Sequence, residues 1–138
     1  MKILVAVDSS QFSEKALAKA VELAQKGGAE LIALAVAEQP LDMGEIAVPV
    51  DLSAHYKAVA AKALEKAAEI ARAKGVTLRP MLEGGSSPAD NIIELAKKEG
   101  VDLIVTGSRG RTGLEKFLLG SVAAKVVSHA VCSVLVVR

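Results

Sequence analysis

The chain has 138 residues and a mass of 14.2 kDa, a size that predicts one domain spanning residues 1–138. Hydrophobic residues make up 51% of it, aromatic residues only 2%, and the net charge is +1. We therefore expect neither a ring platform for single-stranded nucleic acid nor a charged field that recruits DNA or an anionic membrane. The lone cysteine, Cys132, excludes an internal disulfide framework, and no apolar run approaches the ~20 residues that span a bilayer, so a cytoplasmic protein is expected.

Apolar runs and amphipathic stretches alternate through the first half of the chain. Residues 3–7 form a continuous apolar run, typical of a strand buried on both faces, and residues 31–36 form a second. Between them the helical spacing of apolar residues predicts a helix from about Ser13 to Gly27-Gly28. Residues 38–53 show no period and contain two prolines and a glycine, which predicts a long loop.

The second half continues the alternation. A long helix is expected over about residues 53–74, and a strand over residues 76–83. This strand contains Pro80, which cannot donate to a ladder, so it belongs at a sheet edge. Ser87-Pro88 marks the start of the next helix. The remaining expected elements are a strand over 101–106, a helical turn over 114–119, a helix over 121–128 and a strand over 133–137.

This alternation predicts an α/β fold, a single doubly wound five-stranded parallel sheet with helices on both faces. The apolar first strand belongs near the centre and the third at an edge, so the expected strand order is 3-2-1-4-5. Ligands bind such sheets where the strand order reverses, beyond the carboxyl ends of the strands. Residues 8–10 and 107–113 are expected at that point.

The segment after the fourth strand combines glycines, two arginines and a helix start. Glycines let the backbone approach an oxyanion and take positive φ, and successive N–H groups form an anion nest. Arg109 and Arg111 add charge, and the helix that Gly120-Ser121 opens favours phosphate at its N-terminus. A tight turn without a ligand is the alternative, but the position at the strand reversal favours a nucleotide polyphosphate. The chain contains neither a P-loop motif nor a G-x-G-x-x-G after the first strand.

Other polar residues give weaker patterns. His129 and Cys132 lie three positions apart, but two ligands do not make a zinc site, so no metal site built from side chains is expected. Asp8 can hold a magnesium ion together with phosphates, cap the following turn, or contact a ribose; we favour the ribose or a backbone contact. No Ser-His-Asp or Cys-His arrangement can be assigned, so no catalytic residue is expected.

Gly107, two residues, Gly110, nine residues and Gly120-Ser121 match the G-2x-G-9x-G-[ST] motif of ATP-binding universal stress proteins. The sequence resembles this family over nearly its whole length. The other matching segments are Val5-Ala6-Val7-Asp8, Phe12-Ser13, residues 101–105 and residues 134–137. The resemblance implies a Rossmann-like fold of the adenine nucleotide alpha hydrolase type.

The resemblance also implies an ATP site, with Mg²⁺ or Mn²⁺ as a possible companion of the nucleotide. Asp8 and its neighbours would contact the ribose and the adenine edge, Val36 would line the adenine pocket, and the glycine segment with Ser121 would bind phosphates. The expected ATP-binding residues are Ala6, Val7, Asp8, Ser9, Val36, Thr106, Gly107, Ser108, Arg109, Gly110, Gly120, Ser121 and Val122. Since aromatic residues are few, we expect aliphatic walls around the adenine and no ring stacking.

Three positions depart from the family pattern. Ser9, Thr106 and Ser133 stand where Gly, Met and Pro are frequent. The first two border the expected pocket and can alter its affinity, whereas the third affects the entry to the last strand.

The last strand, Val134-Leu135-Val136-Val137, is apolar and is expected at a sheet edge. An exposed edge of this kind invites pairing with another chain, so a homodimer through this strand is expected, as the resemblance also implies. The alternative is that a helix or the 38–53 loop covers it.

The expected function is that of a dimeric, nucleotide-dependent regulator or adaptor in the stress response, which binds ATP without efficient turnover. Two alternatives remain open: a slow ATPase or an enzyme that phosphorylates itself, for instance at Ser121, and an interaction module that binds no nucleotide. The enzyme alternative lacks an obvious residue to orient a water molecule.

Overall fold

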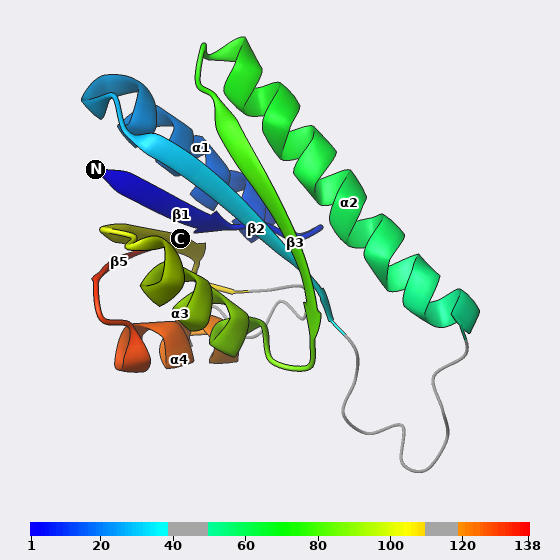
Figure 1. Ribbon diagram of the computed structural model, residues 1–138. Helices are drawn as coiled ribbons and strands as arrows, with labels where there is room; N and C mark the ends of the chain where they lie inside the picture. Colours follow the sequence, from blue (N-terminus) through cyan, green and yellow to red (C-terminus); the bar gives the residue numbers. More distant parts are fainter. Residues whose placement is uncertain (39–49, 110–118) are drawn as a thin grey trace.

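Five parallel strands form one sheet in the order β3-β2-β1-β4-β5, which confirms the predicted topology (Figure 1). The computed structural model describes residues 1–38, 50–109 and 119–138. In chain order the elements are β1 (Lys2–Ala6), α1 (Gln11–Gly27), β2 (Glu30–Glu38), α2 (Val50–Ala73), β3 (Leu78–Gly85), α3 (Pro88–Glu99), β4 (Leu103–Gly107), α4 (Ser121–His129) and β5 (Ser133–Val137).

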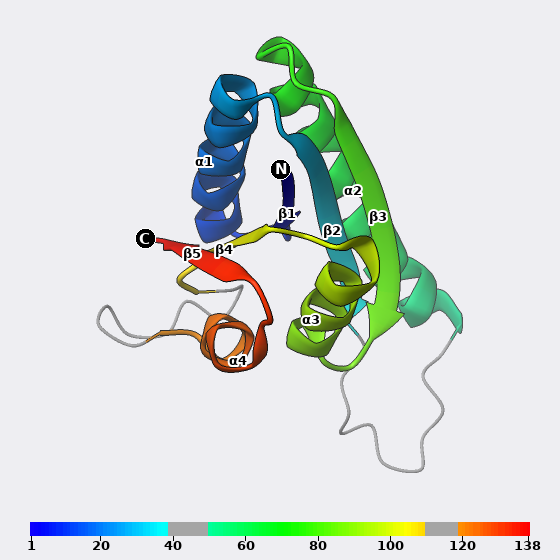
Figure 2. The same ribbon diagram turned by 60° about the vertical axis from the view of Figure 1, so that its left-hand side comes forward.

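Two hydrophobic layers bury the two faces of this sheet. Helices α1 and α2 lie on one face of the sheet, and α3 and α4 lie on the other (Figure 2). The first pair packs on the side chains of Ile3 and Val5, and the second pair packs on those of Leu4 and Ile104. Successive residues of β1 therefore enter opposite cores, which explains why this strand is apolar without interruption. The helices lie where right-handed crossovers place them.

Local sequence signals set several helix ends. Ser10 and Ser87 are the N-caps of α1 and α3, and each side chain accepts a hydrogen bond from a backbone N–H of its own helix. Gly28 and Gly100 end these helices in the left-handed conformation that glycine adopts without strain. The predicted cap at Ser87 is confirmed, but α1 begins at Gln11, earlier than the expected Ser13.

The strand ends differ from the predicted ones because pairing, not composition, decides them. β3 runs to Gly85, beyond the expected end at residue 83, since its ladder with β2 continues to the pair Glu38↔Gly85. β1 ends at Ala6, one residue before its expected end, and β4 ends at Gly107, one residue after its expected end. β3 lies at an edge, as its Pro80 predicts. The long loop expected over 38–53 is shortened because α2 starts at Val50. Residues 39–49 and most of the expected helical turn over 114–119 lie outside the described residues.

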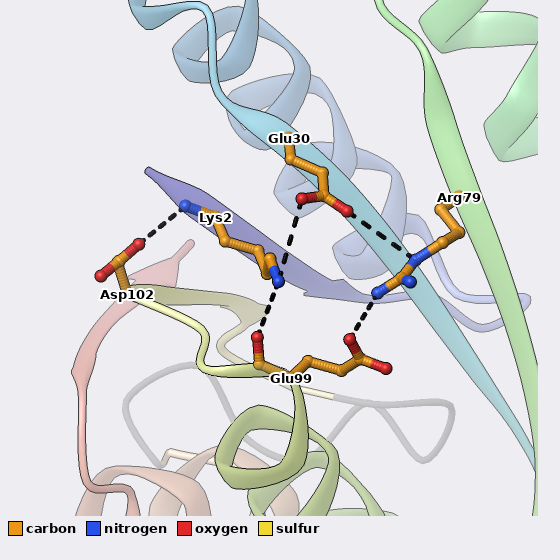
Figure 3. A network of polar contacts seen from close by, with 5 residues as sticks. All are labelled: Lys2, Glu30, Arg79, Glu99 and Asp102. Atoms are coloured by element: carbon orange, nitrogen blue, oxygen red, sulfur yellow. Dashed lines mark hydrogen bonds and ion pairs between the residues drawn. The ribbon is translucent and has the colours of Figure 1, made fainter.

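A network of polar residues lies at the amino ends of the strands, whereas the predicted site lies beyond their carboxyl ends (Figure 3). The Lys2 backbone N–H donates to Asp102 Oδ2 over 2.8 Å, and the Lys2 ammonium donates to the Glu99 carbonyl over 2.8 Å. The guanidinium of Arg79 pairs with the carboxylates of Glu99 at 2.8 Å and Glu30 at 3.9 Å. The hydrogen bond from Arg79 lowers the pKa of Glu99. These contacts tie β1, β2, β3 and α3 together.

Candidate functional site

A cleft of about 520 Å³ lies beyond the carboxyl ends of β1 and β4, where the strand order reverses. This volume falls within the range of small-molecule sites. The structure brings most of the predicted site residues into its wall: Ala6, Val7, Asp8, Ser9, Val36, Thr106, Gly107, Arg109, Gly120, Ser121 and Val122. Gly110 and Arg111 lie outside the described residues.

Three helices begin at this cleft. Ser9 precedes α1, Pro88 starts α3 and Ser121 starts α4, and all three line the wall. The N-termini of α1 and α3 are capped by serine side chains, whereas the N-cap of α4, Gly120, supplies no side-chain hydrogen bond. The N-cap residue therefore leaves the first N–H groups of α4 without a side-chain cap, and the helix dipole favours a negative group near them.

Arg109 brings a positive charge to the same wall. Its guanidinium carbon lies 5.5 Å from the centroid of the Phe12 ring, a cation–π distance. Its Nε is buried and has no hydrogen-bond partner, and it is the one such side-chain atom in the part of the chain that the structure describes. A buried donor without an acceptor is costly, so this nitrogen is suited to an anion that enters the cleft.

Gly107 has a packing role that the motif did not predict. A Cβ atom placed on it would lie 2.9 Å from the carbonyl oxygen of Phe12 and 3.0 Å from the carbonyl carbon. Only glycine allows α1 to begin so close to the end of β4. The expectation that the motif glycines take positive φ is wrong for Gly107 and Gly120; the described glycines with positive φ are Gly28, Gly75 and Gly100.

Ser108 does not line the cleft, in contrast to the prediction. It is buried, its N–H donates to the Val137 carbonyl over 2.8 Å, and its carbonyl accepts the Gly120 N–H over 2.7 Å. Sequence reasoning missed this because both partners come from later elements. Ser108 thus joins the end of β4 to the end of β5 and to the start of α4.

Asp8 caps the turn that follows β1. Its Oδ1 accepts the Ser10 N–H over 2.7 Å, and its own N–H donates to Ser13 Oγ over 2.8 Å. The turn-capping role weighed from the sequence is therefore present, and the exposed carboxylate still lies on the cleft wall. Contact of Asp8 with a ribose stays a prediction.

Sequence reasoning missed an apolar wall formed by β2, α2 and α3. The additional lining residues include Leu34, Tyr56, Val59, Ala60 and Ile92. Tyr56 contradicts the expectation of purely aliphatic walls, since a ring forms part of the wall. Its position one helical turn before Val59 and Ala60 was the available signal, because these three residues share one face of α2.

Two further findings concern metals and membranes. In the described ranges no three or more His, Cys, Asp or Glu side chains gather in a way that could hold a metal ion. None of the described helices has the length and apolar character needed to cross a bilayer.

Comparison with known proteins identifies the family. The model of the universal stress protein family matches residues 1–138. The universal stress protein YxiE of Bacillus subtilis is 41% identical over 146 residues, which covers 99% of this chain and 98% of that protein. A universal stress protein of Methanocaldococcus jannaschii is 38% identical and covers 99% of this chain and 81% of its own.

Solved structures agree with this relationship. Universal stress protein UspA from Lactobacillus plantarum superposes with a TM-score of 0.85 at 32% identity, over 100% of this chain and 97% of its own. A universal stress protein in complex with cAMP gives a TM-score of 0.75 at 28% identity, over 100% and 97% of the two chains. The universal stress protein from Archaeoglobus fulgidus in complex with dAMP superposes with a TM-score of 0.71 at 26% identity, over 100% of this chain and 98% of its own. The chain belongs to the universal stress protein family.

Proposed function

We propose that this protein binds an adenine nucleotide, ATP among them, in the cleft beyond β1 and β4. The base would lie against Val36 and Tyr56, the ribose near Asp8, and the phosphates at the start of α4 beside Arg109. The bound cAMP and dAMP in two structural relatives support this class of ligand.

The observation that carries the proposal is the unsatisfied Arg109 Nε, which shares the cleft wall with the N-terminus of α4, a helix start without a side-chain cap. A phosphate oxygen would accept from this N–H, and the first N–H groups of α4 would bind other oxygens of the same ligand. With ATP, Mg²⁺ or Mn²⁺ would be held mainly by the phosphates, since hard cations take oxygen ligands, and Asp8 is a carboxylate on the wall.

We further propose that the protein acts in the cytoplasm as a homodimer through β5, as a nucleotide-dependent regulator or adaptor in the stress response. β5 lies at a sheet edge, and two large apolar residues that precede it in the chain, Val127 in α4 and Val131, are 49% and 72% exposed. Ser108 supplies a physical connection, because it bonds both to Gly120 at the cleft and to Val137 in β5. If these hydrogen bonds have two arrangements, a ligand that binds one arrangement more tightly would increase its population. The proposed dimer surface at β5 would change with it.

Calorimetric titration with ATP, ADP, AMP, cAMP and adenosine tests nucleotide binding. We expect saturable binding by the wild type and a loss of phosphate-dependent affinity in Arg109→Gln. Arg79→Gln is the matched control. It removes an arginine whose ion pairs lie at the amino ends of the strands, away from the cleft, and this variant should bind nucleotide as the wild type does. Absence of nucleotide binding by the wild type would refute the proposal.

The enzyme alternatives can be tested with the same material. Ser121 lies on the cleft wall at the start of α4, where it would adjoin the phosphates. Incubation with ATP and Mg²⁺ or Mn²⁺, followed by nucleotide analysis and mass spectrometry of the intact protein, measures ADP release and phosphorylation. We expect neither beyond the level of a sample without protein.

A further inference from the structure

Arg109 and Phe12 lie far apart in the sequence but are in contact, and Arg109 lines the cleft. Arg109 follows β4, and Phe12 belongs to the first turn of α1. The guanidinium carbon lies 5.5 Å from the ring centroid, while Nε is buried without a partner. The ring face therefore attracts the positive charge of Arg109 but cannot accept a hydrogen bond in the way an oxygen does. The Nε–H still needs an acceptor from another group.

The Phe12 ring is attached to a firmly held backbone. The Phe12 carbonyl packs so closely on Gly107 that a Cβ atom there would lie 2.9 Å from its oxygen. On either side, Ser10 Oγ accepts the Ser13 N–H over 3.2 Å and Ser13 Oγ accepts the Asp8 N–H over 2.8 Å. The start of α1 is therefore joined to the ends of β1 and β4, and these contacts hold the backbone that carries the ring.

We propose that Phe12 is a positioning residue for the phosphate end of the ligand: its ring holds the Arg109 guanidinium in place so that Nε–H is available to a phosphate oxygen. This inference rests on the proposed adenine-nucleotide function and deepens it. It assigns Gly107, the first glycine of the motif, the task of seating Phe12. It also predicts that AMP binds in preference to adenosine, and that this preference depends on Phe12.

The chemistry of the pair explains why both members are needed. A guanidinium is planar and stacks on a ring while its edge still donates, whereas an ammonium is a compact point charge without that geometry. Without the ring, Arg109 would sample many rotamers and lose side-chain entropy on binding. The contribution of Phe12 should therefore appear only for ligands that carry a phosphate.

The test compares the dissociation constants of AMP and adenosine by calorimetry, each at the same salt concentration. For the wild type we expect AMP to bind more tightly than adenosine. Phe12→Leu should weaken AMP roughly threefold to tenfold, the range of a partly desolvated cation–π contact, and leave adenosine within about twofold. Arg109→Lys should have a similar effect, and the double variant should lose little more than either single one, because the two residues act as a unit.

Phe12→Tyr is the matched control, since it keeps the ring and should restore the preference for AMP. A second readout is the ¹⁵N-labelled Arg109 Nε–H resonance, which should shift on addition of AMP and not of adenosine. If Phe12→Leu weakens AMP and adenosine equally, Phe12 has a merely structural role and the inference is overturned. It is overturned as well if Phe12→Leu changes neither dissociation constant. Binding of neither ligand by the wild type would overturn the nucleotide function itself, which distinguishes the two failures.

Discussion

The Gly107 backbone and the Phe12 carbonyl approach so closely that a methyl group on Gly107 would lie 2.9 Å from the Phe12 oxygen. This contact joins the end of β4 to the first turn of α1 at the wall of the cleft. Because the neighbouring atoms are backbone, they cannot move aside as a flexible side chain would.

Gly107→Ala should destabilise the protein by about 1–3 kcal/mol, the usual cost of overpacking a well-packed site. Urea unfolding followed by circular dichroism measures this. Gly84→Ala is the control, since a Cβ atom there would meet nothing within 4 Å and its φ is not positive. Equal stability of the Gly107 variant and the wild type would show that α1 can shift to make room.

Ser121→Asp should change stability and nucleotide affinity in opposite directions. The first turn of α4 contains no acidic residue, so a carboxylate there should stabilise the helix by about 0.3–1 kcal/mol. The same charge would repel a phosphate and weaken binding roughly tenfold or more. Thermal unfolding and calorimetry measure the two effects. Ser128→Asp, near the other end of α4, should give neither gain in stability nor loss of affinity; a phosphate site elsewhere would leave the affinity of Ser121→Asp intact.

The ion pair between α3 and α4 should make stability depend on acidic pH. Lys125 Nζ lies 2.9 Å from Asp90 Oδ1, and this hydrogen bond, followed by one within the Ser87 cap, lowers the pKa of Asp90. A lowered folded-state pKa stabilises the protein above the unfolded value of about 3.9, and the contribution is lost as the pH falls through the folded value.

Lys125→Met should therefore reduce the urea midpoint near neutral pH by a small amount that shrinks below about pH 4. NMR titration of the Asp90 carboxyl should show its pKa rising towards the ordinary value in this variant. Because both side chains are exposed, added salt should diminish the difference. A constant difference across the acidic range would contradict the assignment.

The proposed dimer predicts a difference between the two edges of the sheet. Val136 in β5 belongs to neither hydrophobic core, so Val136→Lys should preserve the fold while placing a charge in the proposed interface. Sedimentation velocity should then report a monomer. Leu82→Lys on the opposite edge strand, where Leu82 is 41% exposed, should leave the dimer intact. A wild type that sediments as a monomer would refute the dimer.

The topology of this chain and the place of its cleft follow from features of the amino-acid sequence alone. Continuous apolar runs such as residues 31–36 identify strands buried on both faces, and Pro80 places β3 at an edge, because these features act through local backbone chemistry. The same holds for the helix start at Ser87-Pro88. Once the strand order follows, the reversal between β1 and β4 locates the residues that line the cleft.

The role of each of those residues depends instead on contacts made in three dimensions. β3 continues through Gly84 and Gly85 because its partner strand continues. Ser108 bonds to Val137 in β5 and does not line the cleft, whereas Tyr56 of α2 does line it. Gly107 has no side chain, which leaves room for the Phe12 backbone. Each outcome depends on atoms that lie distant in the sequence and close in space, and no local propensity or motif spacing encodes such a distance. The glycine motif thus indicates where a phosphate would bind, whereas packing decides that Gly107 gives room to the backbone of α1.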